Sequence, residues 1–153
     1  MLFNIPGRDP LTIETIILDL NGTLSVAGVI PEGVKERLQK LRSADYKIVF
    51  FTGNTRNDAD ELSRELGIEW RLAADATAKK NLAAEFNAET CVSIGNGLID
   101  LELMKTVALR IVTLQAEGVH IQTLLNSDIV MPSINDALDL LIDPQRLIAT
   151  LRT

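Results

Sequence analysis

The chain has 153 residues, 15 Lys and Arg against 21 Asp and Glu, one cysteine and 46% hydrophobic residues. This composition predicts one globular domain over residues 1–153, with a core large enough to need neither disulfides nor a structural metal. The net charge of -6 argues against nucleic acid as a partner, and no apolar run approaches the ~20 residues of a membrane span. A lone thiol and an N-terminus without a signal-peptide pattern favour a cytoplasmic protein.

Short β-branched runs alternate along the chain with segments of helical period, which is the pattern of repeated βα units. Most of the runs are continuously apolar, so the sequence predicts an α/β fold whose mostly parallel sheet is covered by helices on both faces. The expected strands are residues 15–20, 47–52, 70–73 (the weakest), 91–95, 110–114 and 128–131.

Several helix ends are visible in the sequence. A helix is expected after Pro31, and another from a cap at Asn54 to a stop at Gly67. Two more are expected to begin at Ser133 and at Asp143, each of which is a good N-cap residue.

The first polar cluster, Asp19-Leu20-Asn21-Gly22-Thr23, follows the first buried strand. A carboxylate at a strand end can attack an electrophile or bind a metal, Gly22 permits close approach to the backbone, and Thr23 adds a hydroxyl. An Asn-Gly hairpin turn without a chemical role is the alternative.

The second cluster, Thr52-Gly53-Asn54, leads from a strand towards a helix, where a hydroxyl and free N–H groups suit a phosphate. Helix capping by Asn54 is the alternative. The third is Lys79-Lys80, placed before a helical stretch at 81–86 and, taken alone, typical of a solvated surface pair.

The fourth cluster is Gly95-Asn96-Gly97-Leu98-Ile99-Asp100, again directly after a strand. It is not a dinucleotide-binding fingerprint, because Asp100 stands where that motif has its third glycine. Since the carboxyl ends of parallel strands share one edge of a sheet, the four clusters are expected to meet.

In order and spacing, these clusters resemble the motifs of the haloacid dehalogenase superfamily, and most of all the phosphorylation domain of P-type ATPases and the small soluble P-type ATPases. The resemblance implies a three-layer Rossmann-like domain in which Asp19 forms an aspartyl-phosphate. It implies catalytic roles for Asp19, Asn21, Thr52 and Lys79, and phosphate or substrate contacts for Thr23, Gly53, Asn54 and Lys80. Lys79 is preferred to Lys80 as the motif lysine. The cofactor implied is Mg²⁺, held by Asp19, Asn21, Asn96 and Asp100.

Family members with caps insert domains after the first motif or between the second and third. Only about thirty residues separate Asp19 from Thr52, so a capless form is expected. An open site favours phosphorylated small molecules or macromolecular phosphate esters. An apolar flap at 24–30 favours a homo-oligomer.

Two positions depart from the family pattern. Asn21 replaces the aspartic acid that protonates the leaving group, and Asn96 replaces an acidic metal ligand. The sequence therefore predicts a slow Mg²⁺-dependent phosphohydrolase or phosphotransferase. The alternative is a catalytically degenerate module that binds phosphate or Mg²⁺ in a regulatory role.

Overall fold

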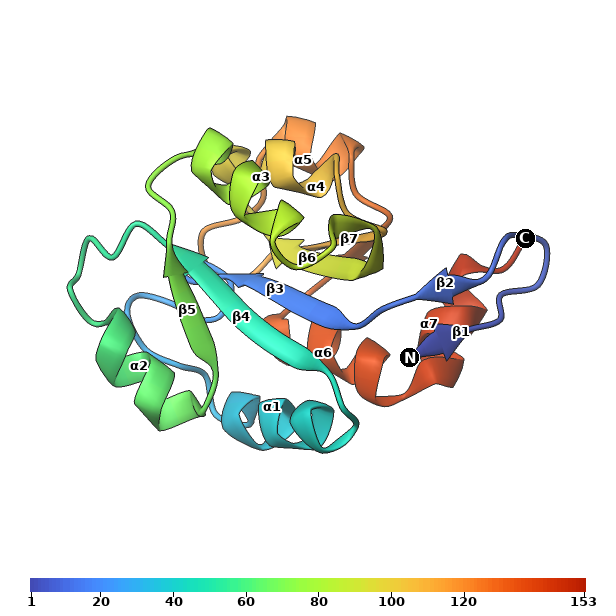
Figure 1. Cartoon of the computed structure of the whole chain (residues 1–153), viewed down its shortest axis with the longest axis horizontal. Coiled ribbons are helices and arrows are strands. Elements are labelled where there is room, and N and C mark those ends of the chain that lie inside the picture. The colour runs from blue at the N-terminus through green and yellow to red at the C-terminus, as the bar shows by residue number, and fades with distance from the viewer.

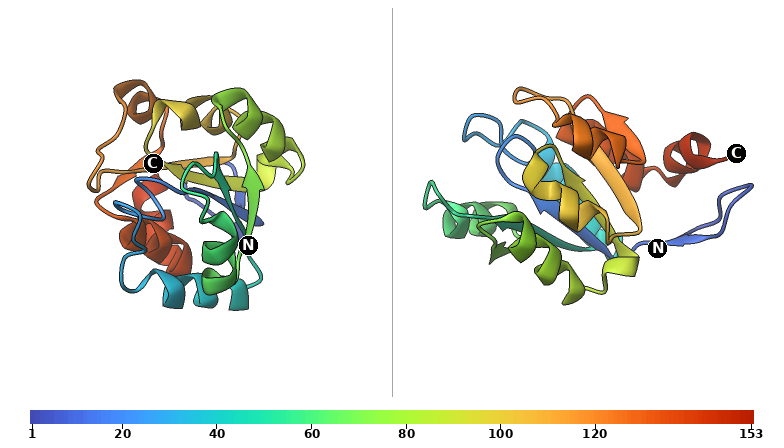
Figure 2. Two further views of the ribbon diagram at one scale, coloured as in Figure 1. Left: turned by 90° about the vertical axis from the view of Figure 1, so that its left-hand side faces the viewer. Right: turned by 90° about the horizontal axis from the view of Figure 1, so that it is seen from above.

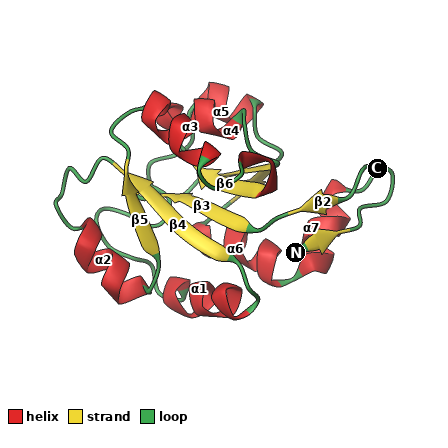
Figure 3. Ribbon diagram, viewed as in Figure 1, coloured by secondary structure: helices red, strands yellow, loops and turns green.

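A six-stranded parallel sheet forms the centre of the computed structural model, which describes all 153 residues (Figures 1 and 3). Its spatial order is β5-β4-β3-β6-β7-β8. The α/β fold expected from the sequence is confirmed, and the strand bounds agree with the expected ones to within one residue. The strands are β3 (Thr15–Asp19), β4 (Lys47–Thr52), β5 (Glu69–Leu72), β6 (Cys91–Gly95), β7 (Leu109–Thr113) and β8 (Ile129–Met131).

Helices cover both faces of the sheet and make three layers (Figure 2, left). One face carries α1 (Val34–Ser43), α2 (Ala59–Leu66) and α6 (Ile134–Ile142). The other carries α3 (Ala76–Ala84), the short 3-10 turns η1 (Ala88–Thr90) and η2 (Leu98–Asp100), α4 (Leu101–Met104) and α5 (Ile121–Leu125).

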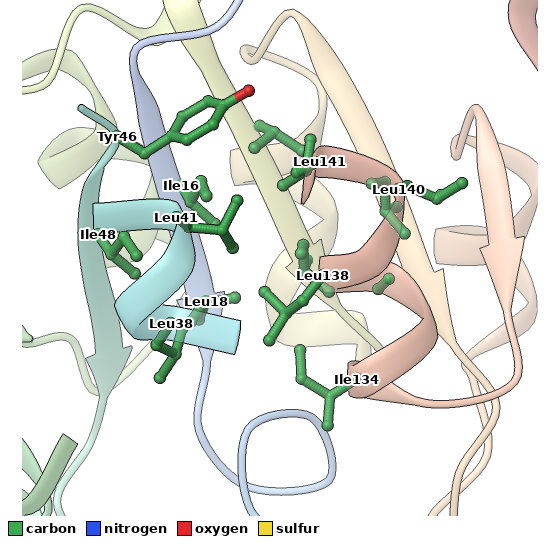
Figure 4. Close-up of a cluster of buried hydrophobic side chains, with 14 of the residues drawn as sticks. Ile16, Leu18, Leu38, Leu41, Tyr46, Ile48, Ile134, Leu138, Leu140 and Leu141 are labelled. Carbon is green, nitrogen blue, oxygen red and sulfur yellow. The ribbon is translucent and has the colours of Figure 1, made fainter. Parts of the chain in front are cut away.

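The two layers of core differ greatly in size. The cluster between the sheet and the α1, α2 and α6 face has 29 buried residues, and the one beneath α3 and α4 has 9. Figure 4 shows part of the larger cluster, where Leu38 and Leu41 of α1 meet Leu138 and Leu141 of α6. Most of the side chains in this layer are aliphatic, as the low aromatic content of the sequence requires.

A small antiparallel pair, β1 (Leu2–Phe3) with β2 (Leu11–Thr12), is not predicted by the sequence analysis. It lies beside α7 (Pro144–Leu151), at the right of Figure 1. Phe3, Leu11 and Leu147 extend the larger core cluster to this end of the molecule.

Two predicted helix starts are wrong. The helix expected from Asn54 begins at Ala59, because Asn54 takes a left-handed conformation (φ 54°) and instead accepts the Ala59 N–H at 3.1 Å with its side chain. The helix expected at 81–86 begins at Ala76, because Asp75 caps it through the N–H of Ala78 at 2.8 Å.

Other predicted ends are confirmed. Gly67 ends α2 in a left-handed conformation, and Ser133 and Asp143 cap α6 and α7 with their side chains. Between Asp19 and Thr52 lie only the flap and α1, so no cap domain is inserted there. None of the helices combines the length and the apolar character needed to cross a membrane.

Candidate functional site

The site lies where the direction of strand order reverses. The chain runs from β3 to β4 and β5 on one side, then crosses to β6, β7 and β8 on the other side of β3 (Figure 1). In open parallel sheets, ligands bind at the carboxyl ends of the two strands flanking this point. A cavity of about 260 Å³ opens there, and seven of its twelve lining residues carry polar side chains. The lining residues are Asp19, Asn21, Thr52, Gly53, Thr55, Ala73, Ala74, Lys79, Asn96, Gly97, Ile99 and Glu117.

Lys79 connects two of the predicted motifs at this cavity. Its Nζ lies 2.5 Å from Oδ1 of Asp19 and 2.7 Å from Oδ1 of Asp100, and only 2% of its side chain is exposed. Lys79 and Ala83 are one helical turn apart on the buried face of α3. The next residue, Lys80, is rotated by about 100° and is exposed to solvent away from the cavity.

Burial and charge shape the titration of this cluster. Burial, with the negative charge of Asp100 adding to it, raises the pKa of Asp19 to about 7, although Lys79 pulls in the opposite direction. Burial alone would lower the pKa of Lys79, but the carboxylates of Asp100 and Asp19 outweigh it and raise that pKa. Lys79 therefore remains a cation at neutral pH, beside a carboxyl group whose pKa lies well above its ordinary value.

Asp100 is held on both sides of its carboxylate. Its Oδ1 accepts from Lys79, and its Oδ2 accepts the backbone N–H groups of Asn96 and Gly97 at 3.1 Å each. A Cβ at Gly95 would lie 2.5 Å from the same Oδ2, so only glycine lets the strand end approach this carboxylate. Asp100 thus fixes the loop after β6 and orients Lys79.

The second cluster contributes in part to the cavity. Thr52 is buried, and its Oγ1 accepts the N–H of Asn54 at 3.1 Å, which leaves its hydroxyl proton free to donate. Gly53 lines the cavity. The side chain of Asn54 is turned away towards the start of α2, so its predicted phosphate contact stays a prediction.

Thr23 and Asn96 are joined beneath the cavity instead of presenting free groups to it. The hydroxyl of Thr23 donates to Oδ1 of Asn96 at 3.3 Å, and Nδ2 of Asn96 donates to the carbonyl of Gly118 at 3.0 Å. A carboxylate could not make the second of these bonds, since it has no proton to donate. Asn96 therefore ties the loop after β6 to the loop after β7.

Sequence reasoning missed the loop after β7. Its Glu117 lines the cavity, while its Gln115 donates to the carbonyl of Gly22 at 3.3 Å and to that of Thr23. A signal was present, because the predicted strand 110–114 ends at the same edge of the sheet as the other motifs. The five residues that follow it held no recognised motif.

The oxygen atoms around the nucleophile allow a test of the predicted Mg²⁺. Lys79 occupies one carboxylate oxygen of Asp19, which leaves the other for a cation, and no hydrogen bond occupies the backbone carbonyl of Asn21. These hard oxygen donors fit Mg²⁺. The side chains of Asn96 and Asp100 are committed to hydrogen bonds within their loops, so their roles as ligands stay predictions.

Comparisons with known proteins agree with the fold. No protein-family model matches the chain. An uncharacterized protein from Methanocaldococcus jannaschii is 40% identical over 86 residues, which are 54% of this chain and 92% of that protein. A soluble P-type ATPase-like phosphatase from the same organism is 26% identical over 135 residues, which are 85% of this chain but only half of that protein.

Solved structures show the same fold at low sequence identity. The 3-deoxy-D-manno-octulosonate 8-phosphate phosphatase of Moraxella catarrhalis, solved with magnesium, phosphate and its sugar acid, aligns with a TM-score of 0.69 and 22% identity over 92% of this chain and 94% of that one. A cobalt-bound phosphatase of the same type from Haemophilus influenzae aligns with a TM-score of 0.70 and 17% identity over 88% and 91%. These likenesses show that the chain has the fold of these phosphatases, as the resemblance of its motif order to the haloacid dehalogenase superfamily led us to expect.

Proposed function

We propose that the chain is a slow Mg²⁺-dependent phosphohydrolase or phosphotransferase that works through an aspartyl-phosphate on Asp19. The observation that carries the proposal is the buried ion-pair cluster at the switch point, in which Lys79 bridges Asp19 and Asp100 within 2.7 Å. A phosphatase-like relative that aligns with 85% of the chain also supports it.

In the first step, a carboxylate oxygen of Asp19 attacks phosphorus while the bond to the leaving oxygen breaks. Lys79 would lower the repulsion between the carboxylate and the anionic phosphoryl group, and the Thr52 hydroxyl and the backbone at Gly53, which both line the cavity, would bind phosphoryl oxygens. When bound, a divalent cation held by Asp19 and the Asn21 carbonyl would supply further neutralisation of charge on the phosphoryl group.

The leaving oxygen needs a proton, and the amide of Asn21 can donate a hydrogen bond but cannot transfer a proton. In the second step, water attacks phosphorus and releases Asp19, and Asn21 cannot accept the proton of that water either. Loss of a general acid–base group typically costs about 10²–10⁴-fold in rate. Substrates with good leaving groups, such as acyl phosphates, should be affected least.

The cavity of about 260 Å³ is open and small, which suits a phosphate group whose alcohol part extends into solvent. The substrate class we propose is therefore a phosphorylated small molecule or an exposed phosphate on a larger one. A homo-oligomer whose neighbour covers the cavity is part of the same proposal.

Intact-protein mass spectrometry with Mg²⁺ and acetyl phosphate tests this function. We expect a covalent phosphate on the wild type that is lost slowly and that Asp19→Asn does not form. We also expect the wild type to release more inorganic phosphate than Asp19→Asn. A wild type that gains no mass and releases no phosphate would favour the alternative, a regulatory module that binds phosphate or Mg²⁺ without turnover.

A further inference from the structure

Glu117 is a carboxylate at the cavity that none of the sequence motifs includes. It belongs to the loop that follows β7, and it lines the cavity together with Asp19, Asn21 and Asn96. No other residue of the structure forms a hydrogen bond or an ion pair with its side chain, so the charge is available to a ligand.

Two sets of hydrogen bonds fix the loop that carries Glu117, one before this residue in the chain and one after it. In the first set, Gln115 donates to the carbonyls of Gly22 and Thr23 and accepts the N–H of Ile134 at 2.8 Å. Between the two sets, Ala116 has a φ of 25°, a strained conformation for a residue with a side chain. Gln115 thus fixes the start of the loop to the turn after the nucleophile and to the beginning of α6.

The second set is formed by Asn96, which donates to the carbonyl of Gly118 and accepts the N–H of His120 at 2.8 Å with its own carbonyl. The result is visible at Gly22, where a Cβ would lie 2.3 Å from Oε2 of Glu117 and 2.8 Å from Nδ2 of Asn96. Glycine at this position makes room for the carboxylate directly above the turn that carries Asn21.

The negative charge of Glu117 matters because two other positions at the cavity carry neutral amides. The resemblance to the superfamily implies acidic groups at positions 21 and 96, and both are amides here. Asn96 uses its amide to hold the loop, and that loop brings a different carboxylate to the same cavity. We propose that Glu117 takes over the missing negative charge and serves, with Asp19 and the carbonyl of Asn21, as an oxygen ligand for the divalent cation.

Glu117 is exposed, so its side chain is free to change rotamer. No three acidic, histidine or cysteine side chains converge on a single point in the structure, so the protein ligands of the inferred site are two carboxylates and one backbone carbonyl. Cation binding would draw Glu117 inward, over the open side of the cavity.

Cation binding without turnover tests this inference, which rests on the cation site of the proposed function. Free Mn²⁺ is measured by electron paramagnetic resonance as it is titrated with the full chain, and Mg²⁺ is then used as a competitor. We expect Glu117→Gln to weaken binding about tenfold, since divalent affinity follows the number of charged ligands. The control Glu85→Gln removes the same charge from an exposed site outside the cavity and should bind as the wild type does.

Equal Mn²⁺ affinity in the wild type and in Glu117→Gln would overturn the inference, as would a wild type without saturable Mn²⁺ binding. Labelling of Asp19 by acetyl phosphate is recorded on the same three proteins. A labelled Glu117→Gln protein with unchanged Mn²⁺ affinity would reject the role of Glu117 and leave the proposed function standing.

Discussion

Two groups of side chains at the cavity, called here the charged side and the amide side, differ in what they can do. On one side, Asp19, Lys79 and Asp100 form a buried cluster of full charges. On the other, Asn21 and Asn96 provide neutral amides, one of which is committed to holding a loop. Under the proposed function, the charged side would accept a phosphoryl group, whereas the amides of the other side cannot transfer protons. Variants of the two sides should therefore affect the acceptance and the release of phosphate differently.

Breaking the charged side should have the largest effect. Lys79→Met would leave two buried carboxylates without their cation, and we expect a loss of about 3–5 kcal/mol in the free energy of unfolding at pH 8, together with loss of phosphoenzyme formation. Urea unfolding measures the first effect and mass spectrometry the second. Lys80→Met is the matched control, because Lys80 is the next residue of the chain and its side chain is exposed. Equal stability of the two variants would show that the ion-pair cluster does not support the fold.

The pH dependence of the free energy of unfolding should show a smaller effect, which belongs to Asp19 on the charged side. The pKa of Asp19 is raised from 3.8 to about 7 in the folded chain, so unfolding releases a proton between these values. Raising the pH through this window therefore destabilises the wild type, by at most about 4 kcal/mol at 1.36 kcal/mol for each pKa unit. Asp19→Asn lacks this titration.

The advantage of Asp19→Asn over the wild type should thus grow from pH 4 to pH 7 and be constant above it. Chemical denaturation at each pH gives this difference, in which the titration of all other groups largely cancels. A difference that does not vary with pH would mean that Asp19 titrates normally in the folded chain.

Restoring an acid to the amide side should sharpen the contrast. Asn21→Asp is expected to raise turnover about a hundredfold, because a carboxyl group can protonate the leaving group and then activate water. Single-turnover kinetics with acetyl phosphate should place most of the gain in the decay of the phosphoenzyme. Asn4→Asp adds the same charge at an exposed position outside the cavity and serves as the control. Unchanged decay would show that Asn21 does not stand at the acid–base position.

Sequence patterns were sufficient for the sheet and for the order of the motifs, because apolar strands and their polar ends are local features. The resemblance to the superfamily favoured Lys79 over Lys80, and the structure places Lys79 against Asp19. Helix starts were less predictable. Asn54 is a good capping residue, but its left-handed backbone delays α2 to Ala59.

The pairing of distant loops could not be derived from the sequence. Asn96 looked like a weakened metal ligand, whereas its amide bonds Gly118 across 22 residues. Gln115 reaches Gly22 across 93 residues, and no periodicity or spacing indicates such a contact. For the same reason Glu117 was not recognised, since only the folded chain brings it over the turn after the nucleophile.

The unequal size of the two core layers has a consequence for motion. The layer beneath α3 and α4 holds 9 buried residues against 29 on the opposite face, so less apolar burial resists its local unfolding. Amide protons of α3 should therefore exchange with solvent sooner than those of α1 and α6. Because α3 carries Lys79, each such opening would move the ammonium group of Lys79 away from Asp19. An anion bound at the cavity could then dissociate more easily.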